Sequence, residues 1–227
     1  MLYDEIAARD NIRNREGKRV FFLGKEDQLT PSARDYLNRE RITILPAQQA
    51  KIHRYILPGG GYIEEKPEHM THLSGDILVY KTHPRIQFRG AVDTLEAELL
   101  LCQIYCDALC KPIQELLDLA RKLISSEVLN EPLPEATLCG LTEAEIRHRS
   151  HFPQEFYGKP HFMPTAAHGA TIAHLNRCRC AARSTELAAA AAFTDPDGNC
   201  TRPDILRALN RMSSVLYLLM IQHKPNA

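Results

Sequence analysis

The sequence has neither a net charge nor an apolar run long enough to cross a membrane. Lys plus Arg and Asp plus Glu both total 28 in a chain of 227 residues, so it lacks the basic surplus that non-specific nucleic-acid binding requires. A transmembrane helix needs about 20 consecutive apolar residues. The first residues do not show the basic and then apolar pattern of a signal peptide. We therefore expect a soluble, cytoplasmic protein with no nucleic-acid and no membrane partner.

Cysteine is present, but in no pattern that builds a disulfide framework. The seven cysteines are an odd number without a Cys-x2-Cys or Cys-Cys pair, which fits a reducing compartment. Cys102, Cys106 and Cys110 recur at four-residue steps and continue an apolar helical stripe, so we interpret them as core residues rather than a metal face. Cys178 and Cys180 point to different faces of a helix, so a shared metal is not expected.

Histidine does not form a recognisable metal motif either. His69-x2-His72 lacks the four-residue spacing of a helical pair, and no Cys-x2-Cys accompanies it. Glu145-x2-His148 is one copy of the motif that binds iron in carboxylate bundles, but such sites need a second copy. The sequence therefore predicts no metal bound by protein side chains.

The N-terminal part predicts a small α/β unit. Residues 19–23 and 41–45 are strand-like, and the Thr-Pro pair at 30–31 offers an N-cap with proline at the first helical position. Residues 49–84 contain a Pro-Gly-Gly-Gly turn and a polar stretch broken by proline, so we expect irregular structure there. The prediction is a β-α-β appendage and linker over residues 1–66.

The remainder, residues 67–227, predicts a helical bundle. From Arg85 onward, apolar residues recur every three or four positions, which is the period of a helix that buries one face. The expected helices run over 85–109, from Pro112, from the capping box Thr142-x2-Glu145, over 168–193 and from Pro203 onward. The predicted fold class is all-α, an up-and-down bundle of four to five helices with a small N-terminal α/β appendage.

The most informative motif is Arg179-x3-Arg183-x2-Glu186 in the helix over 168–193. On a helix the two arginines share a face, and Glu186 lies three residues beyond. Adjacent guanidinium groups repel each other unless an anion lies across them, and phosphate suits them because each planar fork donates two hydrogen bonds. A solvated helix face is the alternative interpretation. The flanking segments favour a phosphate-rich ligand.

Five segments, one of which is this arginine motif, occur in an order that one known family shares. They are Leu29-Thr30-Pro31-Ser32-Ala33-Arg34; His69-Met70-Thr71-His72-Leu73 with Lys81-x2-Pro84-Arg85-Ile86-x2-Arg89-x3-Asp93; Ser150-His151 through Tyr157 with His161-x2-Pro164-x3-His168-Gly169; Arg179-x3-Arg183-x2-Glu186; and Leu209-Asn210-Arg211-x-Ser213-Ser214. Together they resemble the corrinoid adenosyltransferases of the ethanolamine-utilisation type, which are related to the propanediol-type ATP:cob(I)alamin adenosyltransferases. The resemblance covers most of the chain.

The resemblance implies transfer of the 5′-deoxyadenosyl group of ATP to the cobalt of cob(I)alamin, with release of triphosphate. It implies a catalytic set in which Arg183 contacts the phosphates and Asp93 pairs with Arg179 across a subunit boundary. The implied ATP-binding residues are Thr71, His72, Ser74, Lys81, Arg183, Glu186 and Asn210. Since cob(I)alamin is a strong nucleophile, the protein has only to align C5′ and neutralise the leaving triphosphate.

Corrinoid binding is expected in residues 150–164, where the family removes the lower axial ligand of cobalt with apolar side chains. The aromatic candidates are Phe152, Phe156, Tyr157 and Phe162, of which Phe152, Tyr157 and Phe162 form the expected corrinoid-binding set. Ser184 and Leu187 stand where propanediol-type enzymes have further arginines. We therefore expect a different ATP affinity or phosphate geometry.

The chain differs from some members of the family that it resembles, because it lacks one metal-binding motif. Some ethanolamine-type members carry His-x11-Cys-Cys-x2-Cys, whereas this chain has no Cys-Cys pair. A structural zinc or iron is therefore not implied. Mg²⁺ accompanying ATP is the expected metal, and cobalamin is a substrate.

The resemblance also implies partners. We expect a homo-oligomer with its site at a subunit interface, a cobalt reductase, and a B12-dependent ammonia-lyase that uses the product, near or inside a bacterial microcompartment. The alternative is a non-catalytic helical carrier or scaffold, which binds corrinoid or nucleotide without turnover. Consumption of ATP separates the two.

Overall fold

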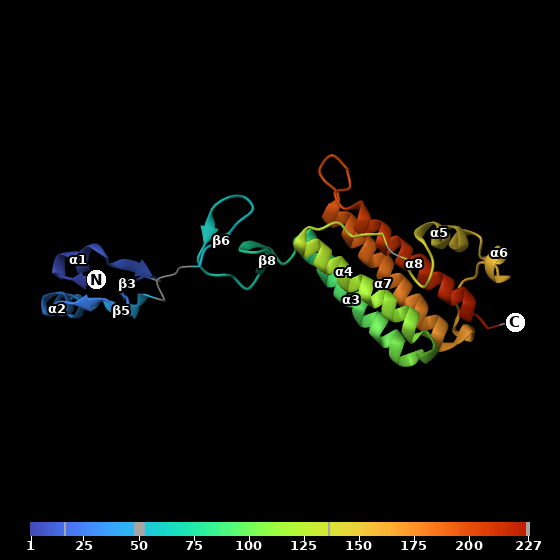
Figure 1. Ribbon diagram of the computed structural model, residues 1–227, viewed down its shortest axis with the longest axis horizontal. Coiled ribbons are helices and arrows are strands. Elements are labelled where there is room, and N and C mark those ends of the chain that lie inside the picture. The colour runs from blue at the N-terminus through green and yellow to red at the C-terminus, as the bar shows by residue number, and fades with distance from the viewer. Residues whose placement is uncertain (16, 48–52, 136, 226–227) are drawn as a thin grey trace. The chain divides into compact units, whose positions relative to one another are not determined.

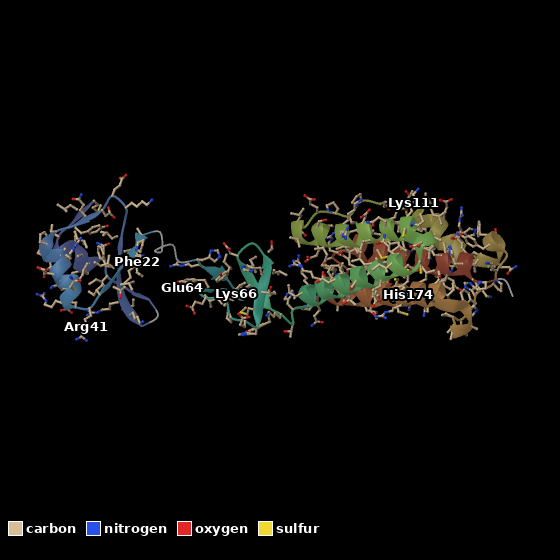
Figure 2. All side chains as sticks on the ribbon, turned by 90° about the horizontal axis from the view of Figure 1, so that it is seen from below. Phe22, Arg41, Glu64, Lys66, Lys111 and His174 are labelled. Atoms are coloured by element: carbon tan, nitrogen blue, oxygen red, sulfur yellow. The ribbon has the colours of Figure 1, made fainter. Side chains whose placement is uncertain are left out.

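The computed structural model describes residues 1–15, 17–47, 53–135 and 137–225. The chain divides into two compact units, an N-terminal unit, Met1–Pro67, and a bundle unit, Glu68–Ala227. Figure 1 shows the elements of each unit and Figure 2 their side chains. Among the described residues, no helix is both long enough and apolar enough to span a membrane.

The N-terminal unit contains a three-stranded sheet with a helical crossover. Strand β3 (Lys18–Leu23) pairs in parallel with β5 (Thr43–Pro46) and antiparallel with β2 (Arg13–Arg15). Helix α2 (Pro31–Arg39) connects β3 to β5. The other elements are β1 (Leu2–Tyr3), α1 (Glu5–Asp10), β4 (Gln28–Leu29), β6 (Tyr55–Ile56) and β7 (Tyr62–Ile63). The predicted β-α-β appendage is confirmed.

The sequence of α2 explains where this helix begins. The Thr30 hydroxyl accepts the Ala33 N–H at 3.2 Å, and proline occupies the first helical turn. Helices α1 and α2, strand β3 and the residue before β5 bury a small core of their own, made of Ala8, Phe21, Ala33, Tyr36, Leu37 and Ile42. The N-terminal unit is therefore held by its own apolar contacts.

The bundle unit is built from four long helices. They are α3 (Pro84–Tyr105), α4 (Cys110–Leu129), α7 (Gly169–Phe193) and α8 (Pro203–His223). Helix α3 packs on α4 and on α7, and α7 packs on α8 (Figure 1). Shorter elements are β8 (Met70–Ser74), β9 (Ile77–Tyr80), α5 (Glu143–His151), α6 (Pro153–Tyr157) and two 3₁₀-turns, Asp107–Leu109 and Ala166–His168. The predicted helical bundle is confirmed.

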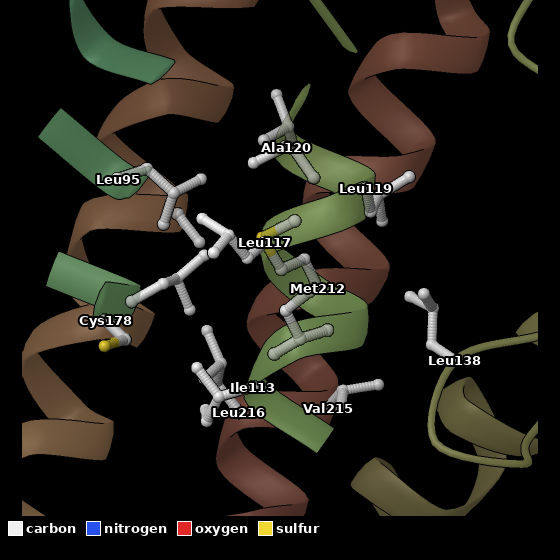
Figure 3. Packing of buried hydrophobic residues seen from close by; sticks show 14 of the residues in the cluster. Leu95, Ile113, Leu117, Leu119, Ala120, Leu138, Cys178, Met212, Val215 and Leu216 are labelled. Carbon is white, nitrogen blue, oxygen red and sulfur yellow. The ribbon is translucent and has the colours of Figure 1, made fainter. Parts of the chain in front are cut away.

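All four long helices contribute to one apolar core, part of which is shown in Figure 3. Leu95 of α3, Leu117 of α4, Cys178 of α7 and Met212 of α8 are all at most 1% exposed. Removing a leucine side chain from such a core costs about 2–5 kcal/mol. This core fixes how α7 and α8 lie against each other, and hence the site described below.

Some predicted boundaries are wrong. The expected first helix ends at Tyr105 rather than Leu109, because the Cys106 backbone (φ −134°, ψ 69°) leaves the helical region. Helix α4 then begins at Cys110, two residues before Pro112. Cys102 and Cys106 are buried as predicted, but Cys110 is exposed because it begins a new helix instead of continuing the stripe.

The prediction of irregular structure over residues 49–84 is also wrong in part. The hairpin of β8 and β9 lies within it, with Met70 opposite Tyr80 and Thr71 opposite Val79. Leu78 and Val79 are buried, and because neighbouring side chains of a strand point to opposite faces, this short hairpin buries an apolar side chain on each face despite its polar flanks. Residues 49–52 of that stretch lie outside the described residues.

Candidate functional site

A polar pocket of about 290 Å³ lies where α5, α7, α8 and the segment before α7 meet. Helices α7 and α8 are consecutive antiparallel helices of the bundle, so positions late in α7 lie level with positions early in α8. The pocket is lined by Ser150, His151, His161, Arg179, Arg183, Ser213, Ser214 and Tyr217. The predicted arginine pair is thus brought together in one pocket, with hydroxyl and imidazole groups opposite it.

Among the residues that the structure describes, the two arginines of this pocket have no counter-ion. Arg179 donates from Nε and Nη2 to the Asn176 side-chain oxygen at 3.2 and 3.1 Å, which orients its guanidinium without neutralising it. Among the described residues, no carboxylate forms an ion pair with Arg179 or Arg183, whereas Arg177 on the same helix pairs with Glu98 at 2.6 Å. Two adjacent positive charges without a carboxylate are an anion-binding arrangement.

Glu186 and Asn210 bridge α7 and α8 next to this pocket. The Asn210 amide donates to Glu186 Oε1 at 3.0 Å. The Asn210 carbonyl accepts the hydroxyls of Ser213 and Ser214 at 2.9 and 3.1 Å. Glu186 is therefore engaged across the helix interface instead of pairing with an arginine of its own helix, and the positive charge of the pocket is preserved.

An apolar pocket of about 380 Å³ adjoins the polar one. It is lined by His161, Phe162, Met163, Pro164, Arg179, Tyr217 and Met220. His161, Arg179 and Tyr217 line both pockets. One continuous region therefore offers a cationic end and an apolar end, which suits a ligand or ligand pair with a charged part and a large apolar part.

Sequence reasoning placed His161 in a motif without assigning it to the site, and it missed Tyr217. His161 Nδ1 lies 2.8 Å from the Tyr217 hydroxyl, and Nε2 lies 3.2 Å from the His151 carbonyl. Because a carbonyl can only accept a hydrogen bond, Nε2 carries a proton. In the neutral ring Nδ1 then accepts a hydrogen bond from the Tyr217 hydroxyl. Tyr217 follows Asn210 by seven residues and so shares its helix face, which is the signal that could have identified it.

The three predicted corrinoid-binding aromatics lie in different surroundings. Phe162 lines the apolar pocket, with Lys224 Nζ 5.0 Å from its ring centre. Phe152 is 54% exposed and contacts the His148 ring. The Tyr157 hydroxyl is buried and has no hydrogen-bond partner among the described residues. Of the three, Phe162 is the one that lines either pocket.

A second group of predicted residues lies at the start of α3. Thr71, His72 and Ser74 are on β8, and the Lys81 N–H donates to the His69 carbonyl at 2.9 Å. Asp93 is exposed on α3 and has no ion pair among the described residues. None of these five predicted residues lines the pocket of Arg179 and Arg183. A single chain therefore presents two separate groups.

Beside this second group is another arginine pair, Arg85 and Arg89. Both guanidinium groups bind the carboxylate of Glu127 on α4, and the Arg89–Glu127 contact is 2.7 Å. His83 caps α3, since its Nδ1 accepts the Arg85 N–H at 3.2 Å. Burial first, and then the charges of Arg85 and Arg89, lower the pKa of His83 below its ordinary value. Sequence reasoning placed Arg85 and Arg89 in a motif but missed Glu127.

In the part of the chain that the structure describes, no three His, Cys, Asp or Glu side chains are grouped so that they could hold a metal ion. Cys102 and Cys178 belong to the bundle core, and their surroundings are those of packed thiols instead of metal ligands. The Cys178 thiol donates to the Glu98 carbonyl at 3.2 Å, and contact with Cys178 followed by burial raises the pKa of Cys102. The Cys102 thiol therefore stays protonated, and both cysteines are buried and pack as small apolar groups.

Comparison with known proteins identifies the family. Residues 61–223 match the family model described as cobalamin adenosyltransferase. The chain belongs to the cobalamin adenosyltransferase family. This match includes both groups of predicted site residues and begins after most of the N-terminal unit.

Curated relatives agree with this family. The corrinoid adenosyltransferase EutT of Salmonella typhimurium is 38% identical over 163 residues, which cover 70% of this chain and 60% of that protein. The EutT protein of Escherichia coli K12 is 37% identical over the same length. The matched region thus spans about 60% of the length of these relatives.

Solved structures show the same fold. An alanine variant of the PduO-type ATP:corrinoid adenosyltransferase from Lactobacillus reuteri, complexed with cobalamin and ATP, matches with a TM-score of 0.50 and 16% identity, covering 68% of this chain and 88% of that one. A histidine variant of the same protein matches with a TM-score of 0.51, covering 68% and 86%. At this identity the likeness establishes the bundle fold alone.

Proposed function

We propose that this chain transfers the 5′-deoxyadenosyl group of ATP to cob(I)alamin, as a corrinoid adenosyltransferase for ethanolamine utilisation. In this reaction the electron pair of cobalt(I) forms a bond to C5′, the C5′–O bond breaks, and triphosphate leaves with its electrons. The observation that carries the proposal is the pocket in which Arg179 and Arg183 have no carboxylate partner in the part of the chain that the structure describes. Such a site suits a leaving group whose negative charge grows in the transition state.

The proposed roles follow from the two groups of residues. Arg183 neutralises the triphosphate, while Asn210 and Glu186 lie beside it across the α7–α8 interface. The second group, Thr71, His72, Ser74 and Lys81, surrounds the rest of the nucleotide together with its Mg²⁺. Since the protein supplies cations and amides instead of a nucleophile, the reaction depends on alignment and charge neutralisation.

We propose a homo-oligomer in which the two groups come from neighbouring subunits. Asp93 is exposed and without an ion pair among the described residues, and Arg179 likewise lacks a carboxylate. Asp93 of one subunit would pair with Arg179 of the next. Helix α3 also exposes Ile104 (70%) and Tyr105 (65%), apolar side chains that a second subunit would cover.

The corrinoid would occupy the apolar end of the site. Phe162 lines that end and is supported by the geometry. Phe152 and Tyr157 would have to approach through movement of the α5–α6 segment, which the exposure of Phe152 permits. We assign residues 67–227 to catalysis and residues 1–66 to an appendage. A cobalt reductase and a B12-dependent ammonia-lyase in a bacterial microcompartment are the proposed partners.

The test is an anaerobic assay with chemically reduced cob(I)alamin, MgATP and the full chain. We expect the cob(I)alamin absorbance band to convert into an alkylcobalamin spectrum, with one triphosphate released for each corrinoid. Binding of corrinoid without conversion would contradict the proposal and would assign the chain to non-catalytic carriers. A reaction that releases phosphate or diphosphate instead would contradict the assigned leaving group.

A further inference from the structure

A fully buried glutamate organises the arginine pair at the start of α3. Glu127 of α4 has an exposed fraction of 0%. One carboxylate oxygen accepts Arg85 Nε and the other accepts Arg89 Nε at 2.7 Å. A buried carboxylate is tolerated only when it is paired and hydrogen-bonded, so each oxygen needs its arginine.

Arg89 extends this network to the strand that carries the proposed ATP-binding residues. Its Nη2 donates to the Leu73 carbonyl at 2.7 Å, and its Nη1 lies 3.4 Å from the His72 carbonyl. Arg85 instead donates its Nη2 back to the Glu127 carbonyl at 3.1 Å. One guanidinium, Arg89, therefore links α4, α3 and β8.

Because the guanidinium of arginine is planar and rigid, this link fixes an orientation as well as a distance. When Nε is held by Glu127, the plane of the Arg89 guanidinium is fixed, and so is the position of the two β8 carbonyls. These carbonyls belong to the peptide units between Thr71 and Ser74, two of the proposed ATP-binding residues. Since both guanidiniums already serve a carboxylate, this pair is poorly suited to bind phosphate directly.

We infer that Glu127 is a positioning residue for nucleotide binding, acting through Arg89 on strand β8. The inference rests on the proposed function, because it takes β8 as part of the ATP site. Fixing β8 before ATP arrives removes an ordering cost from binding. Loss of the link is therefore expected to weaken ATP binding while leaving corrinoid binding unchanged.

Glu127→Gln tests this inference, because it keeps the side-chain shape and removes the charge. In the full chain without substrate, we expect amide hydrogen exchange over residues 70–80 to become about tenfold faster or more. We also expect the KM for ATP to rise by about tenfold while the KM for cob(I)alamin stays the same. Glu127→Asp, which retains the charge on a shorter side chain, should recover part of both effects.

Asp204→Asn is the matched control. Asp204 also binds an arginine, Arg202 at 2.8 Å, and accepts the Leu133 N–H. Burial would raise the pKa of Asp204, but the hydrogen bonds from Arg202 and Leu133 outweigh it and lower the pKa to about 2. This control is expected to speed exchange near residue 133 and to leave residues 70–80 unchanged.

Arg89→Lys is a second variant in case Glu127→Gln does not fold. An ammonium group retains the charge near Glu127, but it cannot reach the carboxylate and the Leu73 carbonyl with the same planar geometry. Exchange over residues 70–80 equal to that of the unchanged chain, in either folded variant, overturns the inference. Faster exchange with an unchanged KM for ATP overturns it as well.

The inference and the proposed function fail in different ways. If the unchanged chain does not adenosylate cob(I)alamin, the proposed function is wrong, and the anchoring of β8 is still decided by exchange. If it does, and ATP slows exchange over residues 70–80 in the unchanged chain but not in Glu127→Gln, the inference is supported. Equal protection by ATP in both would contradict it.

Discussion

Two of the Arg-x3-Arg pairs in the bundle unit, one on α3 and one on α7, have completely different surroundings. Arg85 and Arg89 on α3 share the buried carboxylate of Glu127. Arg179 and Arg183 on α7 share a pocket in which the described residues provide hydroxyl, imidazole and amide groups but no carboxylate. The same spacing thus gives a structural clamp on one helix and an anion site on the other.

This difference shows that the side chains of the helix packed against an arginine pair determine the role of the pair. Helix α4 presents one glutamate to α3, so both arginines of that pair are bound to a carboxylate within the fold. Helix α8 presents serine, asparagine and tyrosine to α7, while Glu186 is bound by Asn210. The first pair is expected to affect stability, and the second is expected to affect ligand binding and catalysis.

The largest effect is expected on the unfolding free energy when the Arg85–Arg89 pair is broken. Arg89→Ala leaves Glu127 buried with one cation, and removing a partner from a buried ion pair costs about 3–5 kcal/mol of unfolding free energy. Urea unfolding at pH 7 measures this loss. Arg177→Ala, which removes a 64% exposed partner of Glu98, is the control and should cost no more than about 1 kcal/mol. Equal losses of unfolding free energy in the two variants would mean that the ion pairs of Glu127 do not stabilise the fold.

Arg183→Ala should have the opposite effects, a large loss of catalytic efficiency and little loss of stability. We expect a loss of about 2–4 kcal/mol in transition-state binding, read from kcat/KM, because one donor to the leaving triphosphate is removed. Arg183 is exposed, so the unfolding free energy should change by less than about 0.5 kcal/mol. The same Arg177→Ala variant serves as the kinetic control on α7. Normal kinetics in Arg183→Ala would remove this arginine from the site.

Asp93→Asn sharpens the comparison by testing what neutralises Arg179. If a neighbouring subunit supplies Asp93, the substitution should lower kcat/KM by about tenfold or more and weaken assembly. Sedimentation at several protein concentrations measures assembly. Since Asp93 has no ion pair among the described residues of its own chain, monomer stability should not change. An unaltered oligomer with full activity would argue against the pairing.

The smallest effect concerns pH. The pKa of His83 is lowered by burial and by Arg85 and Arg89, so the unfolded chain binds more protons between that pKa and its unfolded value of about 6.5. The unfolding free energy should therefore fall as pH decreases through about 6.5, and level off below the folded pKa. His83→Asn retains a cap for α3 and should lose this part of the pH dependence. An identical pH profile in the variant would show that His83 does not contribute.

The fold could be predicted because its signals are local. The Thr30 cap and the proline after it mark the start of α2, and the period of apolar residues marks the long helices. The end of α3 could not be predicted, because the apolar stripe continues through Leu109 while the backbone turns at Cys106. The hairpin of β8 and β9 was missed since its strands are short and its flanks polar.

Less of the candidate site was accessible from sequence. The α7 spacing identified Arg179 and Arg183, and their common pocket agrees with it. Glu127 lies 38 residues from Arg89, and His161 lies 56 residues from Tyr217. Such contacts depend on how helices pack, which no local pattern records. They give the two arginine pairs different roles although the spacing of the two pairs in the sequence is the same.

The most direct test of the central claim is a calorimetric titration of inorganic triphosphate into the unchanged chain and into its arginine variants. We expect measurable binding to the unchanged chain, affinity weaker by about tenfold or more in Arg183→Ala, and normal affinity in Arg177→Ala. This result would establish Arg183 as part of the anion site on α7. Equal affinity in Arg183→Ala and the unchanged chain would contradict that assignment.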